Sequence, residues 1–318
     1  MRTYILRRIL LMFPTLLGAV TLIFLIMRLL PGDVALYILG SDEAGAMNQQ
    51  ALEQIRSDLG LDRPLIVQYF DWIWRAVRLD FGNSYWTRQP VLEELARRYP
   101  ITANLAFLSL LLGTLIAIPI GLLSAVRQDT VVDYAARIFS IAGLSVPSFW
   151  LAILIILGLV HYFQWLPPLD YAPLWVDPWL NFKQLVFPAM ATGYRLSAIG
   201  ARMTRSSVLE VLREDYVRTA RAKGVRDSLV VLRHALKNAL LPVVTILGVE
   251  LLVLFGGLVV VETVFTIPGI GRFLVDAITH RDYPSIQALV FVFAAFVLVV
   301  NLLVDIAYAV LDPRIRYS

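Results

Sequence analysis

The chain has 318 residues, of which 58% are hydrophobic and only 16% are charged, and its mean hydropathy is +0.71. This composition excludes an ordinary soluble domain, because soluble domains carry more charge and rarely hold such long apolar runs. The net charge of +4 is too small to argue for nucleic acid as a partner, and the absence of cysteine excludes disulfides, thiolate chemistry and cysteine-based zinc sites. We therefore expect the lipid bilayer to be the solvent of this chain.

Six stretches are apolar and long enough to cross a bilayer as helices, which takes about 20 residues. In chain order they are 9–30, 101–126, 138–162, 185–206, 239–262 and 286–311. The fourth is the weakest, because Arg195 interrupts it and Arg202 and Arg205 crowd one end. The first is too long for the apolar core of a signal peptide, so we expect an uncleaved first span that stops at the proline and glycine of 30–33.

The long segment between the first two spans, 31–99, is expected to form a small helical domain outside the membrane. Short helices are predicted at 48–59, 64–79 and 91–99, with a turn at 80–83. The second helix carries four aromatic residues, which suit a membrane interface. Two interpretations stay open: a cap that rests on the membrane surface, or a docking platform for an external partner.

The distribution of Lys and Arg predicts orientation, since these residues concentrate in short cytoplasmic connections. With the N-terminus inside, the cytoplasmic segments are 1–8, 127–137, 202–237 and 312–318. They hold 16 Lys or Arg, whereas the short external loops at 163–184 and 263–285 hold three. Both termini and the segment 202–237 are therefore predicted to be cytoplasmic.

Segment 202–237 contains a basic helix that ends in glycine. We expect residues 202–223 to continue out of the fourth span as one helix, supported by Glu214 and Arg218 at i,i+4. Gly224 is placed to end that helix as a C-cap glycine. A second helical stretch, 227–238, then leads into the fifth span.

Small side chains gather at the end of this helix. Thr219, Ala220 and Ala222 would let another surface approach closely, and the basic residues around them, Arg218, Arg221, Lys223 and Arg226, would rim the contact. An anchor that lies on anionic lipid explains the charge. It does not explain the small residues or the glycine, so docking of a protein partner stays open beside it.

The segment resembles the coupling loop of ABC importer permeases of the dipeptide, oligopeptide and nickel type. The similarity lies in DYVRTARAKG at 215–224 and RHALKNALLP at 233–242. Further stretches that resemble the family are LPGD at 30–33, GLDRP at 60–64, DFG at 80–82, RMTRSS at 202–207, ETVF at 262–265, PGIG at 268–271 and RDYP at 281–284. The general importer motif begins Glu-Ala-Ala; here those positions are Arg-Thr-Ala at 218–220, as is usual in the peptide branch, with the glycine in place.

The resemblance implies an all-α polytopic membrane protein with six transmembrane helices, the type I ABC importer permease fold and a small helical external domain. Residues 1–30 would hold the cytoplasmic N-terminus and first span, 31–99 the external loop, and 100–318 a five-helix permease core with its coupling loop at 202–237. The implied partners are a second homologous permease, two ATPase subunits and an external substrate-binding protein. The implied location is a bacterial inner membrane.

The resemblance also implies a role for the basic helix in coupling to the ATPase subunits. The residues concerned are Asp215, Tyr216, Arg218, Thr219, Ala220, Arg221, Ala222, Lys223 and Gly224. ATP and Mg would be bound by the partner subunits, because this chain has no GxxxxGK[ST] motif, and we expect no cofactor, metal or catalytic residue in it. Dipeptides, longer peptides, glutathione and nickel chelates all remain possible substrates.

Two charged residues lie deep in predicted spans. Arg195 and Glu250 each lie 11 residues from the inner ends of their spans, Ser206 and Ala239, or about 16 Å at about 1.5 Å per residue. A charge at that depth is costly unless it is paired or faces water. We hypothesise that the two face the translocation path, paired or nearly so, and meet the charged termini of a peptide-like substrate. The alternative is a structural pair that locks two spans together.

Other features of the spans have structural explanations. Pro119 and Pro147 should kink the second and third spans. Asp305, near the inner end of the last span, should snorkel or contact Arg202 or Arg205. Five glycines should permit close helix approach: Gly113, Gly121, Gly248, Gly256 and Gly257.

A secondary transporter that works alone is the alternative function. It would usually show internal repeats or broken helices around an ion site, and neither is evident. An intramembrane enzyme is disfavoured because the spans show no nucleophile–base arrangement. The three histidines lie far apart without metal-ligand spacing, which disfavours a metalloenzyme.

Overall fold

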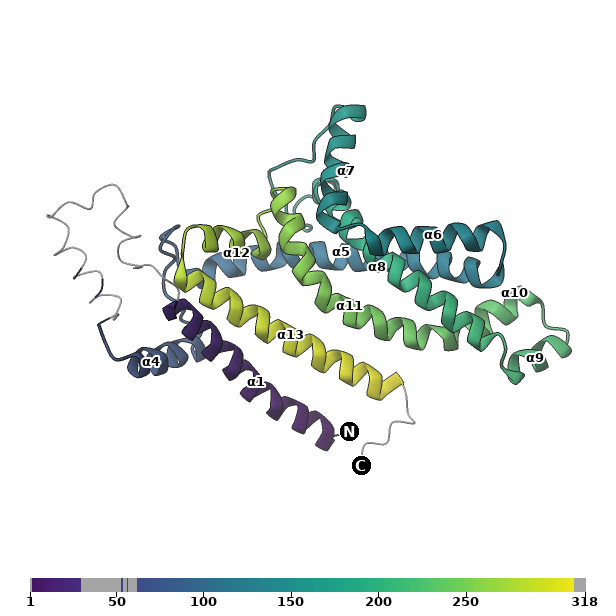
Figure 1. Ribbon diagram of the computed structural model, residues 1–318, viewed down its shortest axis with the longest axis horizontal. Coiled ribbons are helices and arrows are strands. Elements are labelled where there is room, and N and C mark those ends of the chain that lie inside the picture. Colours follow the sequence, from purple (N-terminus) through teal and green to yellow (C-terminus); the bar gives the residue numbers. More distant parts are fainter. Residues whose placement is uncertain (1, 30–52, 54–55, 57–61, 312–318) are drawn as a thin grey trace. The chain divides into compact units, whose positions relative to one another are not determined.

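The computed structural model describes residues 2–29, 53, 56 and 62–311, and that part of the chain is helical without strands (Figure 1). The helices are α1 (Arg2–Leu29), α4 (Leu65–Val77), α5 (Val91–Val126), α6 (Val131–Ser145), α7 (Ser148–Phe163), α8 (Pro178–Val211), α9 (Asp215–Ala222), α10 (Asp227–Leu229), the π-helical turn η2 (Val230–Ala235), α11 (Leu236–Val264), α12 (Ile270–Thr279) and α13 (Tyr283–Leu311). The all-α prediction is confirmed. The helix predicted at 48–59 lies outside the described residues apart from positions 53 and 56.

The chain forms two compact units. Unit 1 consists of Met1–Tyr99 and Phe273–Leu302, and unit 2 consists of Pro100–Arg272 and Leu303–Ser318. Unit 1 therefore holds α1, α4 and most of α12 and α13, whereas unit 2 holds most of α5 and everything from α6 to α11.

Most of the predicted spans are long apolar helices in the described part of the chain. Four segments are long and apolar enough to cross a membrane: Arg8–Arg28, Val91–Val126, Asp227–Val264 and Tyr283–Leu303. They contain the second and fifth predicted spans and cover most of the first, 9–30, and of the sixth, 286–311. The third predicted span is the pair α6 and α7, which bends by 104° at the break before Ser148. Pro147 lies at that break and the expected kink is confirmed, whereas α5 runs on through Pro119.

The fourth predicted span lies in α8, which is not among these apolar helices. This helix packs against α6, α7 and α11. Its buried side chains include polar ones, among them Asn181, Gln184, Thr192, Ser197 and Thr204. Thr192, for example, lies at 2.6 Å from the hydroxyl of Ser109 on α5. Polar residues are tolerated at membrane depth when they face other helices rather than lipid.

Glycines bring the backbones of α5 and α8 into contact. A Cβ on Gly113 would lie 2.8 Å from the Cβ of Leu196, and a Cβ on Gly121 would lie 2.5 Å from the Ala201 carbonyl oxygen. The predicted close approach is confirmed for these two glycines. It fails for Gly256, because no atom of another helix in the described part of the chain lies within 4 Å of its missing Cβ.

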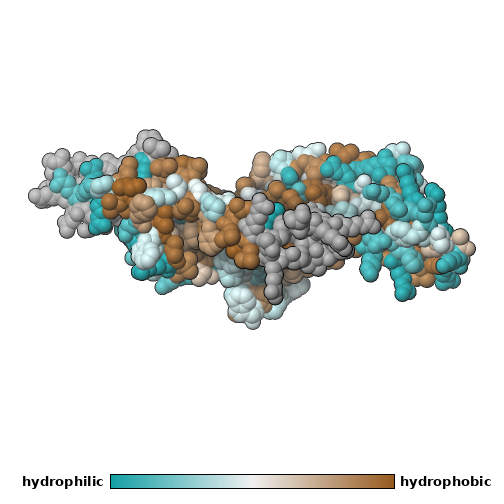
Figure 2. Space-filling model, turned by 90° about the horizontal axis from the view of Figure 1, so that it is seen from below, coloured by the Kyte–Doolittle hydropathy of each residue, from teal (hydrophilic) through white to brown (hydrophobic). Residues whose placement is uncertain are grey.

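The hydrophobic core of unit 2 is built where α5, α7, α8 and α11 meet. Leu105, Leu185 and Leu258 are almost fully buried in it. Outside this core, large hydrophobic side chains are exposed over many helices, as expected for surfaces that face lipid. On the face in Figure 2, hydrophobic residues reach the surface over long stretches, and hydrophilic residues gather over α9 and α10.

In unit 1, α4 packs its aromatic residues on α1. The Tyr69 hydroxyl lies 2.6 Å from the Thr21 hydroxyl, and the Phe24 ring contacts the rings of Tyr69 and Trp72. Trp74, on the other side of α4, stays exposed. The predicted amphipathic helix is thus confirmed.

The DFG stretch that follows α4 forms a tight turn. Gly82 has a φ of +74°, and its N–H donates to Asp80 Oδ1 at 3.1 Å. Arg75 Nε donates to the other carboxylate oxygen at 3.0 Å, and this hydrogen bond lowers the pKa of Asp80. The aspartate and the glycine of this motif therefore act together to reverse the chain.

Candidate functional site

The predicted helix 202–223 is wrong in one respect: the chain breaks at Leu212 and restarts as α9. The break is a turn in which Arg213 N–H donates to the Glu210 carbonyl and Glu214 N–H donates to the Val211 carbonyl. Glu214 then adopts an extended conformation as the residue before α9. Arg218 consequently pairs with Asp215, at 3.4 Å, and not with Glu214 as its i,i+4 spacing had suggested.

One side of α9 is fixed to the rest of unit 2. Val217 is fully buried, Asn238 Nδ2 donates to the Tyr216 hydroxyl at 2.8 Å, and Arg221 Nε donates to Asp227 Oδ1 at 3.0 Å. Sequence reasoning missed Val217, although it is the only aliphatic residue larger than alanine in 215–224. These three contacts tie α9 to the segment that leads into α11.

The opposite side of α9 is open. Asp215, Arg218, Thr219 and Ala222 are all exposed, and their spacing of i, i+3, i+4 and i+7 places them on one face. Only the Asp215–Arg218 pair links side chains within this strip. The strip therefore combines a flat, small-residue surface with one charge of each sign.

Gly224 ends α9 in a Schellman motif. Its N–H donates to the Arg221 carbonyl at 2.9 Å, and the Val225 N–H donates to the Ala220 carbonyl at 3.3 Å. The φ of Gly224 is +76°, in the left-handed region that side-chain-bearing residues adopt only at a cost. The prediction of a C-cap glycine is confirmed, and the requirement is one of conformation, because among the described residues no atom beyond its chain neighbours lies within 4 Å of its missing Cβ.

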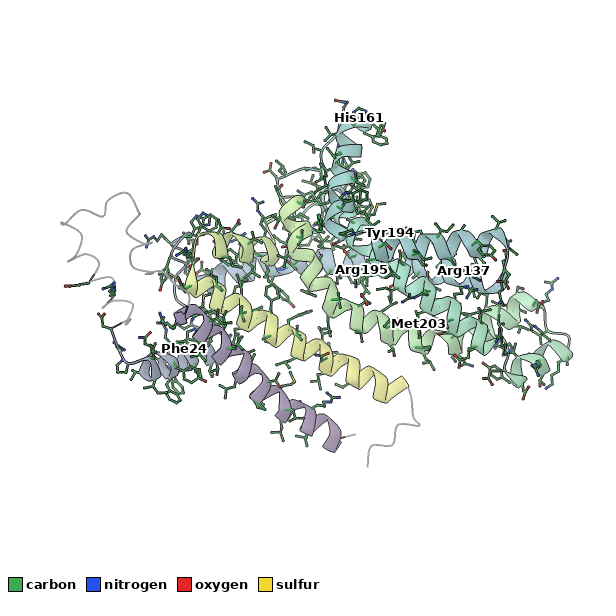
Figure 3. All side chains as sticks on the ribbon, in the orientation of Figure 1. Phe24, Arg137, His161, Tyr194, Arg195 and Met203 are labelled. Carbon is green, nitrogen blue, oxygen red and sulfur yellow. The ribbon has the colours of Figure 1, made fainter. Side chains whose placement is uncertain are left out.

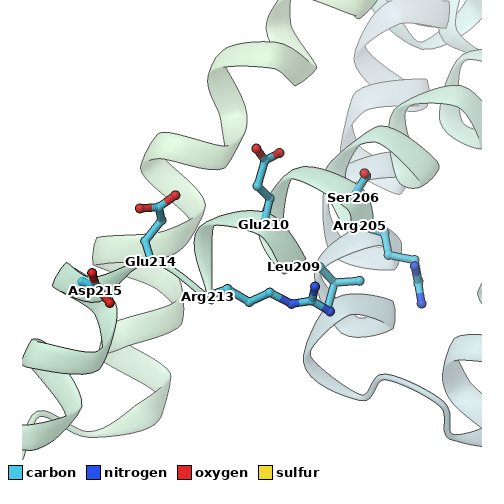
Figure 4. Close-up of a pocket in the computed structure, with 7 residues that line it drawn as sticks. All are labelled: Arg205, Ser206, Leu209, Glu210, Arg213, Glu214 and Asp215. Atoms are coloured by element: carbon cyan, nitrogen blue, oxygen red, sulfur yellow. The ribbon is translucent and has the colours of Figure 1, made fainter.

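A charged groove of about 510 Å³ lies at the junction of α8 and α9 (Figure 4). Its lining residues are Arg205, Ser206, Leu209, Glu210, Arg213, Glu214 and Asp215. Glu210 and Glu214 project to the same side, while Arg213 extends along the turn (Figure 4). Small-molecule pockets are mostly apolar, so a groove lined by charges of both signs is better suited to contact with a protein surface.

The buried carboxylate of Asp133 joins three elements of unit 2 close to this groove. It accepts hydrogen bonds from Arg205 on α8, from Arg137 on α6, from Ser124 on α5 and from the N–H of Asp129 in the connecting turn. Asp133 itself is completely buried. A buried carboxylate is tolerated only when its lone pairs are satisfied in this way.

Sequence reasoning missed this cluster. It offered Arg202 or Arg205 as a contact for Asp305, as the alternative to snorkelling, and the side chain of Asp305 lies outside the described residues. Arg205 instead bonds Asp133, which is 72 residues away in the chain. The Arg137–Asp133 pair does carry a sequence signal, since its i,i+4 spacing on α6 is favourable.

The structure brings Arg195 on α8 and Glu250 on α11 together. Arg195 Nε lies 3.8 Å from Glu250 Oε2, which is within ion-pair distance but too long for a hydrogen bond. Figure 3 labels Arg195 together with its neighbour Tyr194. About half of the Arg195 side chain is exposed, against 12% of Glu250. The neighbouring Tyr194 donates to the Phe139 carbonyl at 3.0 Å, so this turn of α8 is held by α6 while the guanidinium stays accessible.

A second buried carboxylate, Glu262, lies near the C-terminal end of α11. Thr102 Oγ1 donates to it at 2.6 Å and the Arg272 N–H donates to it at 3.0 Å. Thr102 Oγ1 in turn accepts from the N–H of Ile270, the first residue of α12. A Cβ on Gly269 would overlap the carboxylate. The ETVF and PGIG stretches therefore pack against each other, and Gly269 leaves the space that the Glu262 carboxylate occupies.

The RDYP stretch fixes the segment that precedes α5 within unit 1. Asp282 is fully buried and accepts from Ser84 Oγ at 2.5 Å, from the Tyr85 N–H at 2.9 Å and from Ser285 Oγ at 2.6 Å. His280 stacks on Trp86 with ring centroids 4.2 Å apart. Hydrogen bonds to Asp282 and the stacking of Trp86 on His280 therefore hold residues 84–86 against the connection between α12 and α13.

Comparison with known proteins identifies the family. Residues 117–317 match the family described as "Binding-protein-dependent transport system inner membrane component", and residues 1–106 match its N-terminal companion, "Binding-prot-dependent transport system membrane comp, N-term". The glutathione transport system permease protein GsiC of Pectobacterium atrosepticum is 41% identical over 318 residues, which is the whole of both chains. A putative peptide transport system permease protein of Brucella abortus is 40% identical over the same length, again covering both chains entirely.

A solved structure supports the fold. The crystal structure of an amino acid ABC transporter with histidines matches with a TM-score of 0.54 and 16% identity, covering 68% of this chain and 94% of that chain. The apolar helices agree with a multi-pass protein of the inner membrane. The chain therefore belongs to the binding-protein-dependent inner membrane components, as an ABC importer permease of the peptide and glutathione type.

Proposed function

We propose that this permease imports peptide-like substrates and that α9 is the element through which ATPase subunits drive it. The complete importer would contain a second, homologous permease, two ATPase subunits that bind ATP and Mg, and an external substrate-binding protein. Both termini and α9 would face the cytoplasm, as the distribution of Lys and Arg favours.

The observation that carries the proposal is the two-sided construction of α9. One side of α9 is fixed to unit 2 through Val217, Tyr216 and Arg221. The opposite side leaves Arg218, Thr219 and Ala222 exposed. An element that only anchors the chain on lipid needs positive charge but no flat strip of small residues. A short helix that is rigidly held and open on one face suits the surface of a protein partner.

The same contacts supply a route for the coupling. A displacement of α9 would be transmitted to α11 through the Tyr216–Asn238 hydrogen bond. It would be transmitted to α8 through the three-residue turn before Asp215. Because Arg205 bonds Asp133, movement of this end of α8 also moves the connection between α5 and α6. ATP binding would thus favour one state of the helices over the other through differential contacts with α9.

The ion pair of Arg195 and Glu250 is our candidate for a contact in the translocation path. These residues lie on α8 and α11, the two helices that lead to α9 and its anchor. A charged pair inside a membrane protein is usually functional and faces a water-filled cavity. The half-exposed guanidinium is suited to the carboxylate end of a peptide-like substrate.

The substrate class rests on the relatives. Two kinds of relative, named for glutathione and for peptide transport, are about equally similar to this chain. Glutathione and short peptides share a carboxylate, an ammonium group and amide bonds, so one path can serve both. A nickel chelate is the further candidate, and uptake of labelled glutathione, dipeptide and nickel by the same membranes would separate the three.

The decisive experiment is purification of the tagged full-length chain from its native membrane. We expect a second permease and two ATPase subunits to co-purify, and ATP-driven uptake of substrate by the reconstituted complex. A secondary carrier is the competing function. Uptake by the chain alone, driven by an ion gradient and unaffected by loss of the ATPase subunits, would establish that function instead.

A further inference from the structure

An aromatic groove of about 410 Å³ lies between the end of α7 and the first turns of α8. Its lining includes Phe163 of α7, the Trp165 side chain just beyond it, and Trp179 and Phe182 of α8. The rings of Trp179 and Phe182 stack with centroids 5.9 Å apart. The volume lies in the range of roughly 300–1,000 Å³ that is typical of ligand sites.

Lys183 is the only charged residue in the lining of this groove. Its Nζ lies 5.1 Å from the centroid of the Trp179 ring, so a cation–π contact holds the ammonium group at the groove. Among the residues that the structure describes, no carboxylate forms an ion pair with Lys183. The groove therefore offers an apolar surface and one uncompensated positive charge.

The predicted third and fourth spans would place the groove at the level of a membrane interface. The third apolar stretch ends at 162 and the fourth begins at 185, and the groove-lining residues surround both ends. Tryptophan and tyrosine concentrate at this depth in membrane proteins. At the end of α7 and in the connection from α7 to α8, Tyr162, Trp175 and Val176 are each at least 70% exposed, and large exposed hydrophobic side chains of this kind mark sites that bind a partner or lipid.

Lys183 indicates which class of molecule occupies the groove. Lysine is depleted in the cores of protein interfaces, and an ammonium group buried there without a carboxylate is costly. At a lipid surface the same residue lays its stem on apolar groups while its ammonium group meets headgroup phosphates. A phospholipid supplies both the acyl chain and the anion that this groove lacks.

We infer that the aromatic groove between α7 and α8 binds an anionic phospholipid, with an acyl chain against Phe163, Trp165 and Phe182 and the phosphate against Lys183. Binding of this kind is independent of the transport function proposed above and of the side that this interface faces. The lipid would fill the space between α7 and α8 and fix the long connection between them.

Photo-crosslinking tests the inference directly. The full-length chain, with any subunits that co-purify, is placed in nanodiscs that contain phosphatidylglycerol or phosphatidylcholine with a diazirine on one acyl chain. Labelled peptides are then mapped by mass spectrometry. We expect labelling of residues 159–187 to be about fivefold stronger with phosphatidylglycerol, the effect of one lysine near an anionic headgroup.

Four variants make the test specific. Lys183→Gln should abolish the preference for phosphatidylglycerol, and Lys183→Arg should retain it. Lys237→Gln removes the same charge at the start of α11 and should leave the labelling of 159–187 unchanged. Val186→Trp, which fills the groove, should reduce labelling by both lipids.

Two results would overturn the inference. Equal labelling by the two lipids in the unmodified chain would show that Lys183 selects no headgroup. Absence of label from 159–187 in the complex would show that a protein partner covers the groove instead.

Discussion

Arg205 grips the buried carboxylate of Asp133 with two hydrogen bonds, from Nε at 2.7 Å and from Nη2 at 2.8 Å. Two parallel bonds of this kind fix orientation as well as distance. They join α8 to the connection between α5 and α6, at the end of α8 from which the chain continues into α9. The stability of this corner therefore depends on one arginine and one aspartate.

Asp133→Ala should destabilise the protein strongly. Loss of one partner of a buried pair costs about 3–5 kcal/mol, because the remaining charge is left without compensation. We expect a lower midpoint of thermal unfolding, measured for the detergent-solubilised protein. Asp129→Asn is the matched control, because asparagine readily adopts the left-handed backbone of this position, where φ is +60°. The pair of Asp129 with Arg137 is exposed and contributes at most about 1 kcal/mol. Equal loss of stability in both variants would refute the role of Asp133.

Gly224→Val should uncouple transport while membrane insertion continues. The left-handed conformation at this position costs a β-branched residue at least about 1–2 kcal/mol, so the end of α9 would reorganise. Gly224→Asn is the control, since asparagine adopts this conformation readily and no neighbour obstructs its side chain. ATPase co-purification and ATP-driven uptake should fall for valine and persist for asparagine. Normal uptake by the valine variant would contradict the proposed role of α9.

Arg195→Ala should reduce uptake by at least about tenfold without a matching loss of stability. The pair with Glu250 is long and half exposed, so it contributes less than about 1 kcal/mol to folding. Uptake and the midpoint of thermal unfolding are measured together for Arg195→Ala, Glu250→Ala and the double variant. If the pair only locks α8 to α11, the double variant should transport better than either single variant. A pathway residue predicts that the double variant stays as inactive as Arg195→Ala.

Gly269→Ala should impair folding, because its methyl group would overlap the Glu262 carboxylate. Gly256→Ala is the matched control within α11. It meets no atom within 4 Å, and alanine favours a helix over glycine by about 1 kcal/mol. The yield of monodisperse protein on size-exclusion chromatography should drop for the first and hold for the second. Equal yields would show that the protein accommodates a methyl group at position 269 beside the Glu262 carboxylate.

Sequence reasoning succeeded where a feature is local. Apolar runs of about 20 residues, the break at Pro147 and the glycine that ends α9 each follow from the chemistry of neighbouring residues. The pairing of Arg195 with Glu250 was also accessible, because both lie at the same depth of adjacent predicted spans.

The features that sequence reasoning missed depend on distant contacts. Residues 212–214 are leucine, arginine and glutamate, all good helix formers, so nothing local predicts the break between α8 and α9. The break accompanies the burial of Val217 and the hydrogen bond from Asn238. The long, polar α8 was ambiguous as a span for the same reason, since two of its polar side chains, Asn181 and Thr192, meet Asn104 and Ser109 on the distant α5.

The glycine contacts between α5 and α8 restrict how this permease can change shape. Gly113, Gly121 and Gly200 leave no space for even a methyl group where the two helices cross. Sliding one helix along the other by a single residue would drive a side chain into the opposing backbone. We therefore expect α5 and α8 to move together as one rigid body. A conformational change within unit 2 should take place at its other helix–helix contacts.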